Sequence, residues 1–183
     1  SCKFIMNEPL DFCRVKKIDE KGFGFLKSLY YSIDIFFHFS QIKKEEFLEK
    51  LNDMKRGEFF LYYTSKITKE GKRKVSQIWY SLDAVPVELY DGFIDRIIKE
   101  FNEGSSNVYD LLFVFGEMKK MNLLTMGNLL RVLSSSKILR LPTVILPYLD
   151  SNEIEELKLI LKFDELEQSA KKPFWYDDFL KLP

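Results

Sequence analysis

Histidine and cysteine are scarce in this chain, and their scarcity limits the chemistry that it can perform. The 183 residues include one histidine, His38, and two cysteines, Cys2 and Cys13. Two cysteines are too few for a disulfide framework, and together with the carboxylates they show no spacing typical of a zinc site. A nucleophilic triad would have to use His38. We therefore expect a reduced thiol at Cys13, no bound metal, no cofactor and no catalytic residues.

Long apolar runs are also absent. No stretch approaches the ~20 apolar residues that a membrane-spanning helix needs, and the first residues lack the basic and apolar regions of a secretion signal. The composition, 46% hydrophobic and 31% charged, is typical of a globular protein. These features and the few cysteines predict a cytoplasmic protein that does not bind membranes.

Net charge is zero over the whole chain, but its distribution is uneven. Residues 1–84 hold 16 Lys/Arg against 12 Asp/Glu, whereas residues 85–183 hold 12 against 16. Basic side chains near phosphates supply the sequence-independent part of nucleic-acid affinity. The surplus in the first half is modest and is also common in domains that bind nothing charged, so charge alone assigns no function.

Two short aromatic runs stand out in the first quarter of the sequence. Residues 21–26 read Lys-Gly-Phe-Gly-Phe-Leu, and residues 34–39 read Asp-Ile-Phe-Phe-His-Phe. Because alternate side chains of a strand lie on the same face, the first run places Phe23 and Phe25 together.

The second run alternates in the same way. It places Phe36 and His38 on one face, and the opposite face would be core, formed by Ile35, Phe37 and Phe39. Phe36 and His38 would then point to solvent with the rings of the first run. Exposed rings on neighbouring strands are costly unless something stacks on them, and unpaired bases have flat faces suited to this. A barrel that uses these rings for another ligand is the alternative.

The two runs closely resemble the ribonucleoprotein motifs of the cold-shock domain, a five-stranded OB-fold barrel. The likeness extends to Val15-Lys16 before the first motif, to Ser40-Gln41-Ile42 after the second, and to the hairpin sequence Lys-Glu-Gly-Lys at 69–72. It covers roughly residues 10–82. It implies a protein that binds single-stranded RNA or DNA and acts as an RNA chaperone or regulator of transcripts.

Two departures from the family pattern affect this expectation. Lys17-Ile18 stands where the family usually has a Trp-Phe pair, so one stacking ring is replaced by a cation. The segment 43–55 is more charged and more helix-like than the usual family loop. We therefore expect weaker stacking, with a backbone charge contact as partial compensation.

The predicted nucleic-acid-binding site combines the ring face with flanking cations. Taken singly, each lysine is more often a solvated surface residue, and the basic turn near residue 72 is often only a solvated loop. The site residues that we predict are Lys16, Lys17, Lys21, Phe23, Phe25, Phe36, His38, Lys72 and Arg73.

Short strands separated by turn residues are predicted for the first half. A helix is expected between the third and fourth strands, at 44–54, because its apolar residues have helical spacing. The predicted strands are 12–18, 22–27, 34–39, 58–66 and 74–80.

After Pro86 the apolar residues change to helical spacing. A helix that ends at Gly104 is followed by three helices with N-caps at Ser106, Thr125 and Asp150, the last continuing through Leu166. The segment 141–147 is too rich in proline for a helix. The aromatic tail from Phe174 to Leu180 is expected to dock on its own bundle, or alternatively on another protein.

The sequence therefore predicts an α+β protein in two parts: a cold-shock-like OB-fold barrel at 1–85 and a helical domain at 86–183. Its expected function is low-specificity binding of single-stranded nucleic acid, RNA more than DNA. The alternative is an adaptor or effector subunit of a nucleoprotein complex, whose helical domain contacts a protein partner or self-associates. A nuclease with carboxylates in the helical half is a distant third.

Overall fold

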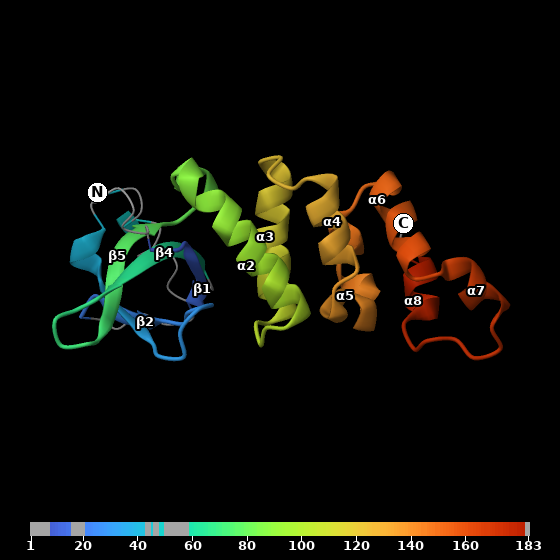
Figure 1. Ribbon diagram of the computed structural model, residues 1–183, viewed down its shortest axis with the longest axis horizontal. Coiled ribbons are helices and arrows are strands. Elements are labelled where there is room, and N and C mark those ends of the chain that lie inside the picture. Colours follow the sequence, from blue (N-terminus) through green and yellow to red (C-terminus); the bar gives the residue numbers. More distant parts are fainter. Residues whose placement is uncertain (1–7, 16–20, 43–44, 46–47, 50–58, 182–183) are drawn as a thin grey trace, which may run out of the picture. The chain divides into compact units, whose positions relative to one another are not determined.

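The computed structural model describes residues 8–15, 21–42, 45, 48–49 and 59–181 (Figure 1). The chain divides into two compact units, Ser1–Phe93 and Ile94–Pro183. Each unit is described by itself below. The helix predicted at 44–54 lies mostly outside the described residues.

The first unit contains a curved five-stranded sheet, as the sequence predicts (Figure 1). The strands run side by side in the order β1-β4-β5-β3-β2, and all neighbouring pairs are antiparallel except β3 and β5. The edge strands β1 and β2 approach each other: the amide of Lys27, directly after β2, donates to Cys13 Sγ on β1 at 3.3 Å. The strand bounds are β1 Asp11–Val15, β2 Phe23–Leu26, β3 Ile35–His38, β4 Phe59–Ile67 and β5 Arg73–Trp79.

The concave face of the sheet encloses the core of this half-barrel. Ile35 and Phe37 are fully buried there, as the alternation of the second aromatic run predicts, and Phe39 is half-buried against the same cluster. Gly24 is needed for close packing, because a Cβ atom at this position would lie 2.5 Å from Cε1 of Phe37. Cys13 is a buried, reduced thiol, as expected.

Residues beyond the sheet cover the outer face of β4. The ring of Tyr62 packs against Phe93 at 5.8 Å between centroids, and the Tyr90 hydroxyl donates to the carbonyl of Leu82 at 2.8 Å. The compact unit that contains the sheet therefore extends past Pro86 to Phe93. The functional division at residues 85/86 stays a prediction.

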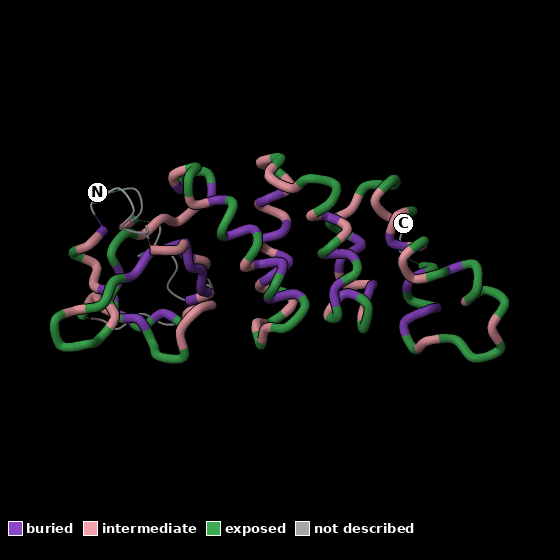
Figure 2. Tube along the Cα trace, viewed as in Figure 1, coloured by how far each residue is buried: buried purple, intermediate pink, exposed green. Residues whose placement is uncertain are grey.

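Helices make up the rest of the chain, as expected from the spacing of its apolar residues. Buried and exposed residues alternate along these helices (Figure 2), and α4 packs beside both α5 and α6. None of the described helices is long and apolar enough to cross a membrane. The helix bounds are α2 Tyr90–Asn102, α3 Val108–Lys120, α4 Met126–Leu133, α5 Ser136–Arg140, α6 Ser151–Ile160, α7 Phe163–Gln168 and α8 Tyr176–Lys181.

Two of the three predicted N-caps are confirmed. The Thr125 side chain accepts from the amide of Asn128, and Asp150 forms a reciprocal capping box with Glu153. The cap predicted at Ser106 is wrong, because the side chain of the next residue, Asn107, accepts instead. An asparagine side chain accepts such a bond as readily as a serine, so neighbouring candidates are hard to separate.

Two further predictions for the helical region need correction. The helix that opens at Asp150 does not continue through Leu166, because Lys162 adopts a left-handed conformation with φ of 54° and separates α6 from α7. The short helix α5 was not predicted. The segment 141–147 forms two short 3-10 turns, in keeping with its prolines.

The aromatic tail docks on its own helical unit. The ring of Tyr176 stacks on Phe163 at 5.2 Å between centroids, and Phe179 lies 5.2 Å from the same ring. Trp175 and Phe179 are buried, whereas Phe174 is 81% exposed. The expectation of self-docking is therefore confirmed for Trp175, Tyr176 and Phe179, but not for the exposed Phe174 and Leu180.

Gly104 follows α2 by two residues, but its φ is not positive. Its role is close packing instead: a Cβ atom there would lie 1.2 Å from Glu100 Oε2 and 2.9 Å from Glu100 Cα. The carbonyls of Gly104 and Glu100 both accept from the ammonium of Lys137, which ties the end of α2 to α5.

We expect Gly104→Ala to destabilise the helical unit by about 1–3 kcal/mol, because overpacking forces the Glu100 side chain and the backbone apart. Thermal unfolding of the full chain followed by circular dichroism would measure this. Gly92→Ala is the matched control, because a Cβ at Gly92 meets no atom within 4 Å. Equal melting temperatures for Gly104→Ala and Gly92→Ala would contradict the packing role.

Candidate nucleic-acid interface

The register of β2 and β3 brings the four predicted rings together on the convex face of the sheet. Phe23 lies opposite His38, and Phe25 lies opposite Phe36. The ring centroids are 6.2 Å apart for Phe23 and Phe25, 6.0 Å for Phe23 and Phe36, and 5.6 Å for Phe25 and Phe36. We call Phe23, Phe25, Phe36 and His38 the ring face.

The ring face is open to solvent to an unusual degree. Phe25 is 57% exposed and Phe36 is 38% exposed, whereas the intervening Phe37 is fully buried. Phe23 and His38 are half-buried beside them. The strands are therefore anchored by their inward side chains, and the outward rings are held in place by the backbone.

A short 3-10 turn, Phe39–Gln41, fixes the imidazole of His38. The ring Nδ1 accepts from the Ser40 amide at 3.0 Å, and the Gln41 carboxamide accepts from the His38 amide at 2.9 Å while donating to the Val75 carbonyl at 2.6 Å. Because Nδ1 is an acceptor, the neutral ring carries its proton on Nε2. His38 thus offers a fixed ring and one donor.

The five predicted cations fall into three groups: exposed residues, residues outside the described ranges, and Arg73, which is described below. Lys21 is exposed just before β2, and Lys72 is exposed at the turn that joins β4 to β5. The amide of Lys72 donates to Thr68, which closes that turn. Lys16 and Lys17 lie outside the described residues, so their predicted role stays a prediction.

Arg73 is engaged within the protein. Its guanidinium lies 3.6 Å from the centroid of the Tyr31 ring and donates to Ser65 at 3.1 Å and to Glu8 at 3.3 Å. Its side chain is only 11% exposed. The geometry therefore fits a residue that holds the Tyr31 loop better than one that offers its charge to solvent.

The loop between β2 and β3 is anchored by a buried carboxylate that the sequence analysis missed. Asp11 Oδ1 accepts from the amides of Phe12 at 2.9 Å and Leu29 at 2.8 Å, and its Oδ2 accepts from the Ser28 hydroxyl. Ser28 Oγ in turn accepts from the amides of the next two tyrosines, Tyr30 and Tyr31. The chain of bonds from Asp11 therefore positions the loop that leads into β3. Only the apolar residues that flank Asp11, just before the predicted first strand, could have suggested burial.

Burial perturbs the ionisation of this network. Desolvation raises the pKa of Asp11 above its usual 3.8, although the amides of Leu29 and Phe12 and the Ser28 hydroxyl act in the opposite direction. Desolvation also raises the pKa of Tyr63, and the nearby charge of Asp11 raises it further. The Tyr63 hydroxyl donates to the Lys27 carbonyl at 2.5 Å, so it stays protonated as a structural donor.

We expect the contribution of Asp11 to stability to fall as pH rises. A carboxyl whose folded-state pKa is raised binds its proton more tightly when folded, so its contribution is greatest below the unfolded pKa of 3.8 and declines as pH rises through the folded pKa. Urea unfolding of the wild type and Asp11→Asn across this range would show the difference in unfolding free energy shrinking with rising pH. A difference that grows would contradict the raised pKa.

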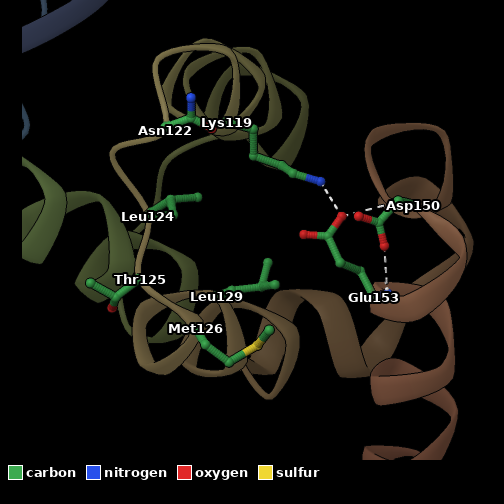
Figure 3. A pocket seen from close by; sticks show the side chains of 8 residues that line it. All are labelled: Lys119, Asn122, Leu124, Thr125, Met126, Leu129, Asp150 and Glu153. Atoms are coloured by element: carbon green, nitrogen blue, oxygen red, sulfur yellow. Dashed lines mark hydrogen bonds and ion pairs between the residues drawn. The ribbon is translucent and has the colours of Figure 1, made fainter.

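A pocket of about 250 Å³ is present in the helical unit, where the end of α3 meets the starts of α4 and α6 (Figure 3). Its charges are largely satisfied internally: the Lys119 ammonium donates to Glu153 and to the Tyr148 carbonyl, and Asp150 caps α6. No group of three potential metal ligands occurs among the residues that the structure describes. The pocket is lined by Lys119, Asn122, Leu124, Thr125, Met126, Leu129, Asp150 and Glu153.

Comparison with known proteins supports the resemblance carried by the aromatic runs. The family model of the 'Cold-shock' DNA-binding domain matches residues 13–78, and no family model matches the remainder of the chain. No curated protein and no solved structure matches the chain. The matched segment contains β2, β3, β4 and nearly all of β5, including the whole ring face. Residues 13–78, which form most of the OB-type half-barrel, are therefore similar to the cold-shock domain, a family whose members bind nucleic acid, and the helical region that follows has no family match.

Proposed function

We propose that the ring face binds single-stranded nucleic acid by stacking unpaired bases on Phe23, Phe25, Phe36 and His38. The observation that carries this proposal is the cluster of mutually contacting exposed rings on β2 and β3. Every base has a flat face, and a base stacked on an aromatic side chain contributes ~1–3 kcal/mol. Bases in a duplex are already stacked and paired, so the ring face favours unpaired strands.

This mechanism implies low sequence specificity. Stacking discriminates weakly among bases, and the ring face adds one fixed donor, Nε2 of His38, by which a base edge could be read. A protein that prefers unpaired strands shifts weak secondary structure toward the melted form. We therefore propose the role of a nucleic-acid chaperone or regulator, with RNA preferred to DNA on the strength of the family resemblance. A cytoplasmic location belongs to the same proposal.

Direct titration tests the proposed function. A fluorescently labelled, pyrimidine-rich strand of RNA should bind the full chain more tightly than the same strand annealed to its complement, when both are followed by anisotropy. A DNA strand of the same sequence tests the preference for RNA. Equal affinity for strand and duplex would contradict the stacking mechanism.

A second candidate function is that of an adaptor. The observation in its favour is that the helical unit exposes several large apolar side chains, among them Phe174 at 81% and Leu159 at 70%. An adaptor should bring one defined protein in stoichiometric amount when the tagged full chain is purified, and Phe174→Ser should reduce that amount if the tail contacts the partner. A chain that co-purifies with nucleic acid alone supports the chaperone role. Neither role requires a catalytic residue.

A further inference from the structure

A row of four outward side chains crosses the sheet from β2 to β4. Phe25 lies opposite Phe36, Phe36 lies beside Lys74 on the parallel neighbour β5, and Lys74 lies opposite Lys66 on β4. Residues paired in this way project from the same face of a sheet. The row therefore runs from two rings to two ammonium groups.

Burial and register together place both lysines on the outward face. Lys74 is exposed while the next residue, Val75, is fully buried. Lys66 is exposed, as is Ile67 after it, so the outward direction of Lys66 follows from its pairing with Lys74 and from the pairing of buried Ser65 with Val75. The register irregularity between Thr64 and Ser65 lies on the side of Ser65 away from Lys66, so it leaves the pairing of Lys66 with Lys74 intact.

Like charges directly opposite each other destabilise a sheet. In the described part of the chain, the ion pairs include neither Lys66 nor Lys74, although Arg73 beside them is paired with Glu8. The hairpin thus carries an uncompensated pair of cations next to the ring face. An anion bound between them would offset their repulsion.

We propose that Lys66 and Lys74 bind backbone phosphates of a strand whose bases stack on Phe25 and Phe36. The inference rests on the proposed function and extends it, since it gives the path of the strand across the sheet. The row covers three strand spacings of ~4.8 Å, or ~14 Å. The bound nucleic-acid strand therefore runs from the ring face over β5 to β4, across the β-strands and not along β3.

Salt dependence of binding tests the two lysines in the full chain. With a single-stranded oligonucleotide of uridines as the probe, Lys66→Ala and Lys74→Ala should each lower the slope of log affinity against log salt by ~0.7. Lys99→Ala is the matched control: Lys99 is exposed on α2, and its removal changes net charge equally. Slopes for Lys66→Ala and Lys74→Ala equal to that of Lys99→Ala would overturn the inference.

A charge reversal supplies a second readout that does not depend on the salt slope. Lys66→Glu places opposite charges across β4 and β5, so the melting temperature of the free protein should rise while affinity for the strand falls. A loss of affinity caused by misfolding would instead lower the melting temperature. A lower melting temperature, or unchanged affinity, would overturn the proposed phosphate site.

Failure of strand binding and failure of the phosphate site give different results. If the wild type shows no preference for the single strand, the proposed function itself is wrong. If the wild type binds the strand and Phe25→Ala weakens it, but both lysine variants retain the wild-type slope, only the proposed path across β5 and β4 is wrong.

Discussion

Replacing Phe25 and Phe36 together by alanine is expected to weaken binding of a single strand by at least about tenfold. Each lost base–ring stack costs ~1–3 kcal/mol, and ~1.4 kcal/mol corresponds to one factor of ten in affinity. Both rings are exposed, and the buried side chains of β2 and β3 anchor the strands without them. The fold should therefore survive, and an anisotropy titration would measure the loss.

The control for this experiment is an exposed ring elsewhere. Tyr109→Ala removes an aromatic side chain that is 61% exposed at the start of α3, and it should leave affinity unchanged. An unchanged circular dichroism spectrum of the double variant would exclude unfolding. If the correctly folded double variant binds as tightly as the wild type, the ring face does not bind nucleic acid.

The second large effect concerns stability. Asp11→Ala should lower the free energy of unfolding of the sheet unit by about 3 kcal/mol, because the amides of Phe12 and Leu29 and the Ser28 hydroxyl lose their acceptor. Each buried donor left unsatisfied costs ~1–3 kcal/mol, and relief of a buried charge offsets part of the sum. Urea unfolding near neutral pH would measure the change. The unfolding of the sheet unit is followed by the fluorescence of Trp79, which lies in β5.

Two milder variants define the expected order. Asp11→Asn keeps an acceptor oxygen for the two amides but places a donor near Ser28 Oγ, which already accepts from Tyr30 and Tyr31. Ser28→Ala leaves the carboxylate in place. Both should lose less stability than Asp11→Ala. An Asp11→Ala protein as stable as the wild type would show that the buried network does not support the fold.

The ring face could be predicted because its signal is local. Alternation with a period of two decides which side chains of a strand share a face. Phe36 and His38 can therefore be assigned to one face, and Ile35 and Phe37 to the other, before the partner strand is known. The order and spacing of the two aromatic runs then indicated the OB-fold, through their resemblance to the cold-shock motifs. The structure adds the register that puts Phe25 opposite Phe36.

The roles of Arg73 and Asp11 could not be predicted, because they depend on contacts between residues far apart in the chain. Arg73 reaches Tyr31 on a loop and Glu8 near the N-terminus, whereas the sequence shows only one member of a basic turn. The partners of the Asp11 carboxylate, Ser28 and Leu29, lie 17 and 18 residues further along the chain. Such partners become visible only with the tertiary structure.

In the helical half, periodicity and cap residues found the long helices and several of their ends, but not the end of α6. The break at Lys162 has no glycine or proline to mark it, and a lysine with φ of 54° contradicts local propensity. Gly104 follows the end of α2, as predicted, but the reason for a glycine there is the close approach of Glu100 and not a positive φ.

Photo-crosslinking would identify the residues on which the bases of a bound strand stack. A single strand of RNA that contains 4-thiouridine is bound to the full chain and irradiated, and the modified peptides are sequenced by mass spectrometry. Stacking on the ring face predicts that the crosslinked residues are Phe23, Phe25, Phe36 and His38, and that an excess of unlabelled strand suppresses them. Crosslinks confined to residues 94–183, with the ring face unmodified, would show that the helical unit and not the ring face binds the strand.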